Sequence, residues 1–232
     1  LYMDEFQSAI TAAGGLDVIG FPGACSMSAL ESAYELRNCC DVYVGSEDGA
    51  YYNIWFDVFD DLCDYLNDYP AATPQEIAVL LVDLAGDNIT SAFETQTVSS
   101  LNLSEISSLV ASFDDLCSCM LANIDELGAV IEEARIGTWY MGRPYYVWPE
   151  IDFMDFLVYY LAAEDDPEVR SLIQQTMEDF NEVILNEAHG TFHDGRVYGL
   201  SIWYPTSPDS ELDLYTGTDL DFADDTNWDE FL

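Results

Sequence analysis

Two short, almost wholly apolar runs on either side of a helical pattern constrain the fold of this chain more than any other feature. Residues 16–21 read LDVIGF and residues 41–46 read DVYVGS, as expected of strands buried on both faces of a sheet. Residues 26–37 between them repeat apolar side chains at helical spacing, and Ser26 can cap that helix. Such a strand–helix–strand unit predicts a right-handed crossover and a parallel strand pair.

The rest of the chain reads mainly as helix. Helical patterns cover residues 2–13, 51–66, 74–84, 104–134, 151–161 and 167–186, with a start at Thr73-Pro74 and a break near Asn123. Residues 196–204 (RVYGLSIWY) predict a third apolar strand. We therefore expect a cysteine-bearing half of an α/β core (residues 1–68), a mainly helical region (69–190), and a last core strand with a C-terminal tail (191–232). Three strands are few for a sheet with helices on both faces, so we expect strands from outside the chain to complete it.

The charge of the chain excludes one class of partner. Five Arg, no Lys and 45 Asp plus Glu give a net charge of −40, and nucleic-acid binding needs a basic face. Because 50% of the residues are hydrophobic and 14% aromatic, the chain is globular rather than an acidic disordered tail. No apolar stretch is long enough to span a membrane. The acids favour a solvated coat, and attraction of basic substrates or Ca²⁺ is the functional alternative.

Cysteines and glycosylation sequons favour an extracellular or cell-surface location. The six cysteines contain no C-x-x-C pair and neither histidine lies near them in sequence, which argues against a zinc site. Apart from Cys25, we expect at least one disulfide, joining the Cys39/Cys40 pair or Cys63 to Cys117 or Cys119. The sequons Asn88-Ile-Thr and Asn102-Leu-Ser point to the same compartment.

Cys25 is the candidate nucleophile. It follows the first apolar run and the turn Pro22-Gly23, which places its thiol at the carboxyl edge of the sheet, where open α/β folds bind ligands. The N–H groups at the start of the next helix would favour the reactive thiolate. A cysteine after a strand is more often a small buried residue, so its position alone does not establish this role.

Several motifs in order resemble the clostripain family of cysteine peptidases. They are GFPGACSM (residues 20–27), ESAYEL (31–36), VYVGSE (42–47), GLSIWYP (199–205) and WDEFL (228–232). The family carries a Phe-Asp-Ala-Cys-Leu-Met motif, an Ala-Tyr-Glu-Leu helix and a strand that ends in Ser-Glu. The resemblance covers essentially the whole chain. It implies a caspase-like fold: a mostly parallel sheet flanked by helices, with a mainly helical C-terminal extension.

The resemblance also implies roles for particular residues. Cys25 would attack a peptide carbonyl to form an acyl-enzyme, and its backbone N–H would contribute to an oxyanion hole. Ser46 and Glu47 would help to line the substrate groove. The family's aspartate two residues before the cysteine, which helps to receive a basic side chain, is replaced by Gly23, so a preference for Arg or Lys does not carry over. Calcium is a candidate cofactor by the same resemblance, with no ligands assigned.

The general base is missing from the expected place. In this family, as in caspases, it is a histidine upstream of the cysteine, on the neighbouring strand. His189 and His193 lie far downstream in a Gly-rich turn, and we expect them to be exposed loop histidines. The chain begins shortly before Cys25, about where a heavy chain would start, so a cleaved N-terminal light chain or a neighbouring subunit would complete the sheet. The alternative is a catalytically inactive clostripain-like module with a structural or binding role at the cell surface.

Overall fold

A mixed four-stranded sheet forms the centre of the fold. The computed structural model describes residues 3–90, 92–142, 149–205, 215 and 220–232. The sheet has the order β1-β2-β3-β5 and consists of β1 (Leu16–Gly20), β2 (Cys40–Gly45), β3 (Thr97–Asn102) and β5 (Ile184–His189). β1 and β2 are parallel, as predicted, whereas β2–β3 and β3–β5 are antiparallel. The α/β class and the flanking helices are as expected, but among the strands of the described residues only the cysteine strand β1 and its neighbour β2 form a parallel pair.

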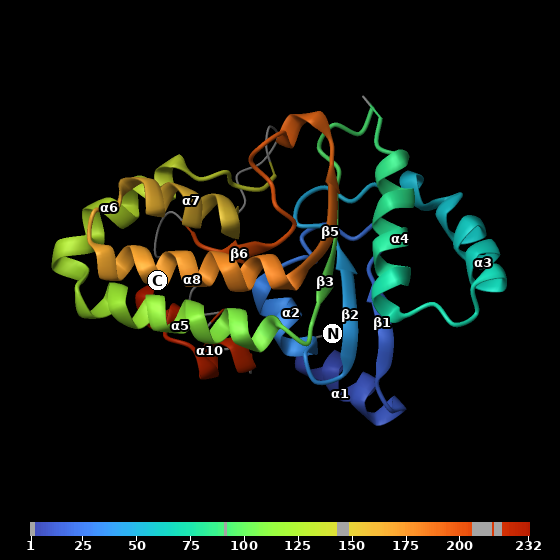
Figure 1. The fold of residues 1–232 in the computed structure, drawn as a ribbon, viewed down its shortest axis with the longest axis horizontal. Coiled ribbons are helices and arrows are strands. Elements are labelled where there is room, and N and C mark those ends of the chain that lie inside the picture. Colours follow the sequence, from blue (N-terminus) through green and yellow to red (C-terminus); the bar gives the residue numbers. More distant parts are fainter. Residues whose placement is uncertain (1–2, 91, 143–148, 206–214, 216–219) are drawn as a thin grey trace.

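The alternation of side chains along β2 explains why both faces of the sheet are covered. Val42 and Val44 lie on one face in a core with α4 (Pro74–Asp87), while Tyr43 points to the opposite face. That second face carries the larger core, to which α2 (Leu30–Leu36) and α5 (Ile106–Ala122) contribute. Figure 1 shows α4 alone against one side of the sheet and the long helices gathered on the other. Coverage on both faces accounts for the apolar residues at successive positions of β2.

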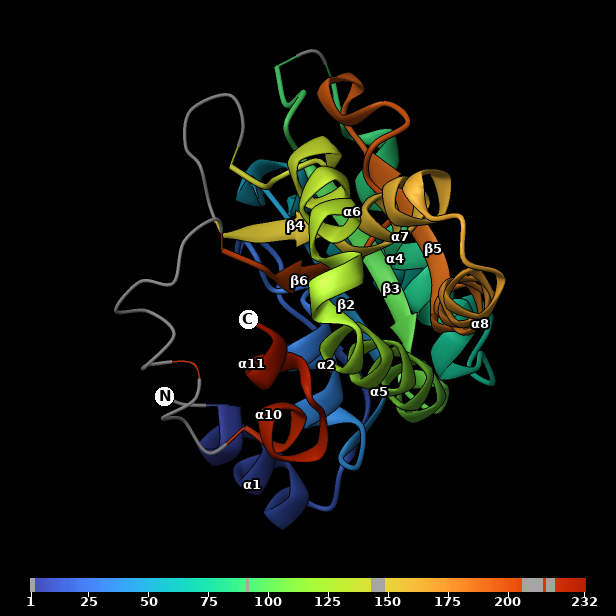
Figure 2. The ribbon, with the colours of Figure 1, turned by 90° about the vertical axis from the view of Figure 1, so that its left-hand side faces the viewer.

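The remaining helices form a layer beside the sheet and at its ends. α5 packs on α8 (Pro167–Val183), and α6 (Ile124–Gly137) packs on α7 (Phe153–Ala163). The smaller elements are α1 (Met3–Ala13), η1 (Tyr52–Trp55), α3 (Val58–Asp68), η2 (Thr191–His193), α10 (Asp221–Asp225) and α11 (Trp228–Phe231). Figure 2 shows α10 next to α2, while α11 packs on α5, so the C-terminal part of the chain returns to the helix that follows Cys25. No helix among the described residues is both long and apolar enough to cross a membrane.

Two helix boundaries expected from the sequence are confirmed by the structure. Thr73 and Glu76 form a reciprocal capping box at the start of α4, with Pro74 in the first turn. Asn123 ends α5 and begins α6, at the break expected from the sequence. Two polar strands were missed. β3 reads TVSSLN, and β5 follows α8 directly and continues its helical pattern in the sequence.

Three expectations are corrected by the structure. The helix expected from residue 26 begins at Leu30. The last strand, expected over 196–204, is only β6 (Ser201–Trp203), and it pairs with β4 (Glu150–Asp152) in a separate two-stranded sheet. The expected disulfide is wrong, because all six cysteines are free. Cys39 and Cys117 are buried in the core, where thiols pack as small apolar groups, and the cysteines therefore no longer support an extracellular location.

The outer edge of β1 is open. β1 is the first strand in the order of the sheet and pairs only with β2 among the residues that the structure describes. Leu16, at the start of this edge strand, is half-exposed. An edge strand with free N–H and C=O groups is normally covered in a folded protein, so this edge is a place where the sheet can continue.

Candidate active site

Cys25 lies in an exposed turn beyond the carboxyl end of β1. Its Sγ accepts a hydrogen bond from the backbone N–H of Ala50, at 3.3 Å. The helix-terminal N–H groups that the sequence suggested are not its neighbours, since α2 begins five residues later, at Leu30. The segment that follows β2 therefore supplies the polar contact to the sulfur.

The cysteine turn is held in place by the end of β2. Ser26 has a φ of 54°, which is uncommon for a residue other than glycine, and its N–H donates to the carbonyl of Asp48. The N–H groups of Met27 and Ser28 both donate to the carbonyl of Ser46, at 2.7 and 3.0 Å. Strained backbone persists only where its surroundings determine it, and here the loop after β2 does so.

Gly23 occupies a position that has no room for a side chain. Its φ is 76°, and a Cβ at this residue would lie 3.0 Å from Cβ of Tyr52 and 3.2 Å from its Cα. At position 23 the chain therefore contributes only backbone, and no charged side chain, to the surface beside Cys25. Tyr52 packs against this glycine.

The side chains of Ser46 and Glu47 turn into the protein. Ser46 Oγ bonds to the carbonyl of Gly49 and to Oγ1 of Thr97, both at 2.8 Å. Glu47 is only 1% exposed, and its Oε1 accepts from the N–H of Gly199 at 2.9 Å. Both side chains fasten the loop after β2 to its surroundings, and a role for either residue in binding substrate stays a prediction.

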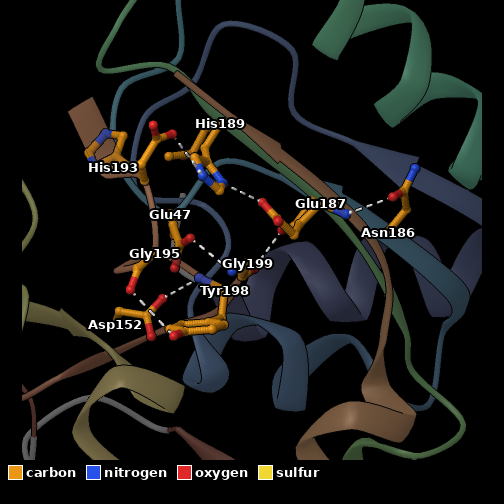
Figure 3. A network of polar contacts seen from close by, with 12 residues as sticks. Glu47, Asp152, Asn186, Glu187, His189, His193, Gly195, Tyr198 and Gly199 are labelled. Atoms are coloured by element: carbon orange, nitrogen blue, oxygen red, sulfur yellow. Dashed lines mark hydrogen bonds and ion pairs between the residues drawn. The ribbon is translucent and has the colours of Figure 1, made fainter. Parts of the chain in front are cut away.

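Glu47 belongs to a buried polar network, which Figure 3 shows. Burial, followed by the neighbouring carboxyl of Asp152, raises the pKa of Glu47 well above its ordinary range. Burial likewise raises the pKa of Asp152 to about 7, although Asp152 accepts bonds from the N–H groups of Asp155 and Tyr198. Two acids buried together retain a proton at neutral pH because both cannot ionise without water. No local sequence pattern indicates this pair, since Glu47 lies in the loop after β2 and Asp152 is the last residue of β4.

Asp48 and His193 form a second buried pair next to the cysteine turn. Asp48 Oδ1 accepts from the N–H of Gly142, while its Oδ2 lies 3.6 Å from Nε2 of His193. Nδ1 of His193 accepts from the indole N–H of Trp139, which leaves the proton of a neutral ring on Nε2. Burial raises the pKa of Asp48 to about 6 and lowers the pKa of His193.

Neither histidine is an exposed loop residue. His193 is completely buried in η2. His189 ends β5, and its Nδ1 lies 2.7 Å from Oε2 of Glu187, a contact that raises its pKa. β5 is three strand positions away from β1, roughly 14 Å at the usual strand spacing. The expectation of exposed histidines is therefore wrong, and both rings have partners other than the sulfur of Cys25.

The family motifs near the end of the chain hydrogen-bond to the segment that follows Cys25. Ser201 donates from its N–H and its Oγ to the carbonyl of Ser28, at 2.9 and 3.1 Å. Glu35, buried on α2, accepts from the N–H of Phe222 at the start of α10. Trp228 is fully buried and donates from its indole N–H to the carbonyl of Trp203. These contacts attach the end of the chain to the cysteine-bearing half.

The described residues suggest no site for calcium or another metal. Within residues 3–90, 92–142, 149–205, 215 and 220–232, no group of three or more His, Cys, Asp or Glu side chains could hold a metal ion. We therefore assign no ligands to a metal.

Comparisons with known proteins agree with the fold. The clostripain family model matches residues 1–232, while no curated protein matches the chain. A clostripain from Bacteroides thetaiotaomicron ATCC 29148, solved in complex with a peptide inhibitor, is 15% identical, with 97% of this chain and 94% of that chain covered and a TM-score of 0.66. An inactive zymogen C11 protease from Parabacteroides distasonis is 21% identical, with 97% and 62% covered and a TM-score of 0.62. A secreted C11 cysteine protease from Bacteroides thetaiotaomicron, bound to an irreversible peptide inhibitor, is 16% identical, with 99% and 64% covered and a TM-score of 0.64.

Proposed function

The chain belongs to the clostripain family, and on that premise we propose that it is the cysteine-bearing part of a cysteine endopeptidase. The observation that carries the proposal is the turn of Cys25. The thiol is exposed beyond the carboxyl end of β1, and its sulfur accepts the N–H of Ala50. A cysteine that served only for packing would be buried, as Cys39 and Cys117 are.

The proposed reaction is acyl transfer. The thiolate of Cys25 adds to a peptide carbonyl, the C–N bond breaks as the amine leaves with a proton, and water then hydrolyses the thioester. The N–H of Cys25 donates to no acceptor that the structure describes, so it is available to the negative oxygen of the tetrahedral intermediate. Gly23 would contribute backbone to the substrate groove, and Ser46 and Glu47 would shape the groove through the loop they hold.

The base is proposed to reside on a segment that pairs with the outer edge of β1. This edge is open among the described residues, and the chain spans only 62% of the similar zymogen chain. A strand added there would lie beside the cysteine strand and could bring a histidine to within roughly 3 to 6 Å of the Cys25 sulfur. The segment would be a light chain from the same precursor or part of a neighbouring subunit.

An extracellular site of action belongs to the same proposal. It is supported by the similar protein that is described as secreted. The sequon at Asn88 gives it little support, because the Asn88 amide already donates to the carbonyl of Ile54.

The alternative function is a catalytically inactive binding or structural module. The observation that favours it is that His189 and His193 both have partners away from the cysteine. The two functions differ in what the thiol of Cys25 does in the full-length protein.

The test compares two exposed cysteines. Cys25→Ala in the full-length protein is expected to lower kcat/KM on a mixed peptide library by at least about 10³-fold, because the covalent step is lost. Cys63→Ala is the matched control, since Cys63 is also exposed but lies on α3, and its activity should match that of the wild type. Undiminished cleavage by the Cys25→Ala protein, or no cleavage by the fully processed wild type, would rule out the peptidase.

A further inference from the structure

Exposed aromatic side chains begin immediately beside the cysteine turn. Tyr52 and Phe56 are 66% and 67% exposed, and their rings meet edge to face with centroids 5.5 Å apart. We call these two residues the aromatic shelf. Large aromatic groups left this open on a folded protein commonly mark a binding surface.

The shelf is continuous with the nucleophile. Gly23 precedes Cys25 by two residues, so their Cα atoms are at most about 7 Å apart. Tyr52 lies against Gly23, with 3.0 Å between its Cβ and the place a Gly23 Cβ would take. Two residues before Tyr52, the N–H of Ala50 bonds to the Cys25 sulfur. A peptide whose carbonyl reached that sulfur would pass directly beside Tyr52.

The acids of the same loop face away from this surface. Glu47 Oε1 bonds to the N–H of Gly199, and Asp48 Oδ1 bonds to the N–H of Gly142, with both side chains buried. Gly23 can add no carboxylate, because its conformation and the contact with Tyr52 leave no room for one. The chain places aromatic rings beside Cys25 and turns the carboxyls of Glu47 and Asp48 inward, while Asp57, next to Phe56, is exposed.

We propose that the aromatic shelf of Tyr52 and Phe56 receives the side chain of the substrate residue whose carbonyl Cys25 attacks, and that it selects aromatic or large aliphatic residues over Lys and Arg. The inference rests on the proposed peptidase function and adds the substrate class to it. An apolar side chain gains by leaving water on the two rings, whereas Gly23 and the buried carboxyls of Glu47 and Asp48 offer no charge to a cation beside the sulfur.

The experiment uses the full-length processed protein and peptides that differ only at that residue. With Phe or Leu there, kcat/KM should exceed the value with Lys or Arg by about 10-fold or more. Tyr52→Ala should lower kcat/KM for the Phe peptide by about 10- to 100-fold and for an Ala peptide by much less. Tyr69→Ala is the matched control, because Tyr69 is 59% exposed at the far end of α3, and it should leave every peptide unaffected.

Two further measurements distinguish a failure of the proposed substrate preference from a failure of the proposed peptidase function. Iodoacetamide should label Cys25 equally fast in wild-type and Tyr52→Ala protein, which shows that the turn itself is intact. Cleavage with a preference for Lys or Arg would overturn the inference and leave the peptidase standing, whereas no cleavage of any peptide would overturn both. Release of an N-terminal segment from the Tyr52→Ala protein, with unchanged peptide preference, would show that the shelf binds that segment and would also overturn the inference.

Discussion

The loop after β2 has an inward side and an outward side, and the two are built from opposite chemistry. Glu47 and Asp48 turn inward, where they bond to backbone N–H groups and meet other titratable side chains. Ala50 and Tyr52, a few residues on, face the cysteine turn and solvent. In a chain of net charge −40, the acids that shape the site are thus the buried ones, and the surface beside Cys25 is aromatic. We therefore expect the inward side of the loop to control stability and the outward side to control the choice of substrate.

A change in pH should produce the largest effect, and it should act on the inward side. Burial raises the pKa of Asp152 to about 7 and of Asp48 to about 6, and it also raises the pKa of Glu47 well above its ordinary range. The unfolded values are near 4, so between about pH 4 and pH 7 the folded protein holds more protons than the unfolded chain. The free energy of unfolding is therefore expected to fall as pH rises through this window. Urea midpoints at about pH 5 and about pH 8 measure the change.

Buried glutamates on α2 and the buried imidazole of His193 also affect the pH dependence of stability. Glu31 and Glu35 on α2 have pKa values raised to about 7 by burial and add to the loss of stability. Burial lowers the pKa of His193, so this one residue makes the free energy of unfolding rise with pH, opposite to the effect of the acids. Measurements in about 1 M salt remove most of the general repulsion among surface acids. A double variant, Glu47→Gln with Asp152→Asn, should flatten the pH dependence, and an equally steep dependence in that variant would contradict the assignment.

Removing one inward carboxyl should cost more than removing an exposed one in the same local role. Asp152 and Asp166 both cap helices, α7 and α8, with their side chains. Asp152→Ala leaves two buried N–H groups without an acceptor, so at about pH 5 we expect a loss of about 2–4 kcal/mol in the free energy of unfolding. Asp166→Ala, where water can replace the carboxylate, should cost about 1 kcal/mol. Equal losses by urea denaturation would show that burial of the capping carboxyl does not set the size of the loss.

The smallest expected effect lies on the outward side, at the contact between Gly23 and Tyr52. Gly23→Ala and Gly195→Ala both place an alanine at a positive φ, at a cost of roughly 1 kcal/mol each. Nothing lies within 4 Å of a Cβ at Gly195, whereas at Gly23 the Cβ meets Tyr52. We expect Gly23→Ala to lose about 1 kcal/mol more, as overpacking does, in thermal or urea unfolding. If Gly23→Ala and Gly195→Ala lost the same free energy of unfolding, Tyr52 would have to move away from the turn at no cost.

Local patterns determined much of this protein in advance. The runs at 16–21 and 41–46 identified β1 and β2 because a short apolar run bounded by turn residues is typical of a strand, although only β2 is buried on both faces. Thr73-Pro74 and Asn123 marked helix boundaries because capping depends on a few adjacent residues. The same local order, strand then turn, put Cys25 at the sheet edge, and the family motifs around it are consistent with the fold that the structure has.

Tertiary structure alone decided the rest. β3 and β5 are polar strands that exist because β2 offers them partners, a relation that no local pattern contains. The contact of Glu47 with Asp152, the burial of His193 and the position of Tyr52 over Gly23 each join residues far apart in the chain. Even the failure of the expected disulfide has this origin, because pairing needs sulfurs brought together in space, whereas Cys39, Cys40 and Cys117 are buried as free thiols and Cys63 is exposed on α3. Local sequence determined the apolar strands β1 and β2 and most of the helices, whereas packing determined β3, β5 and which side chains face Cys25 and which face inward.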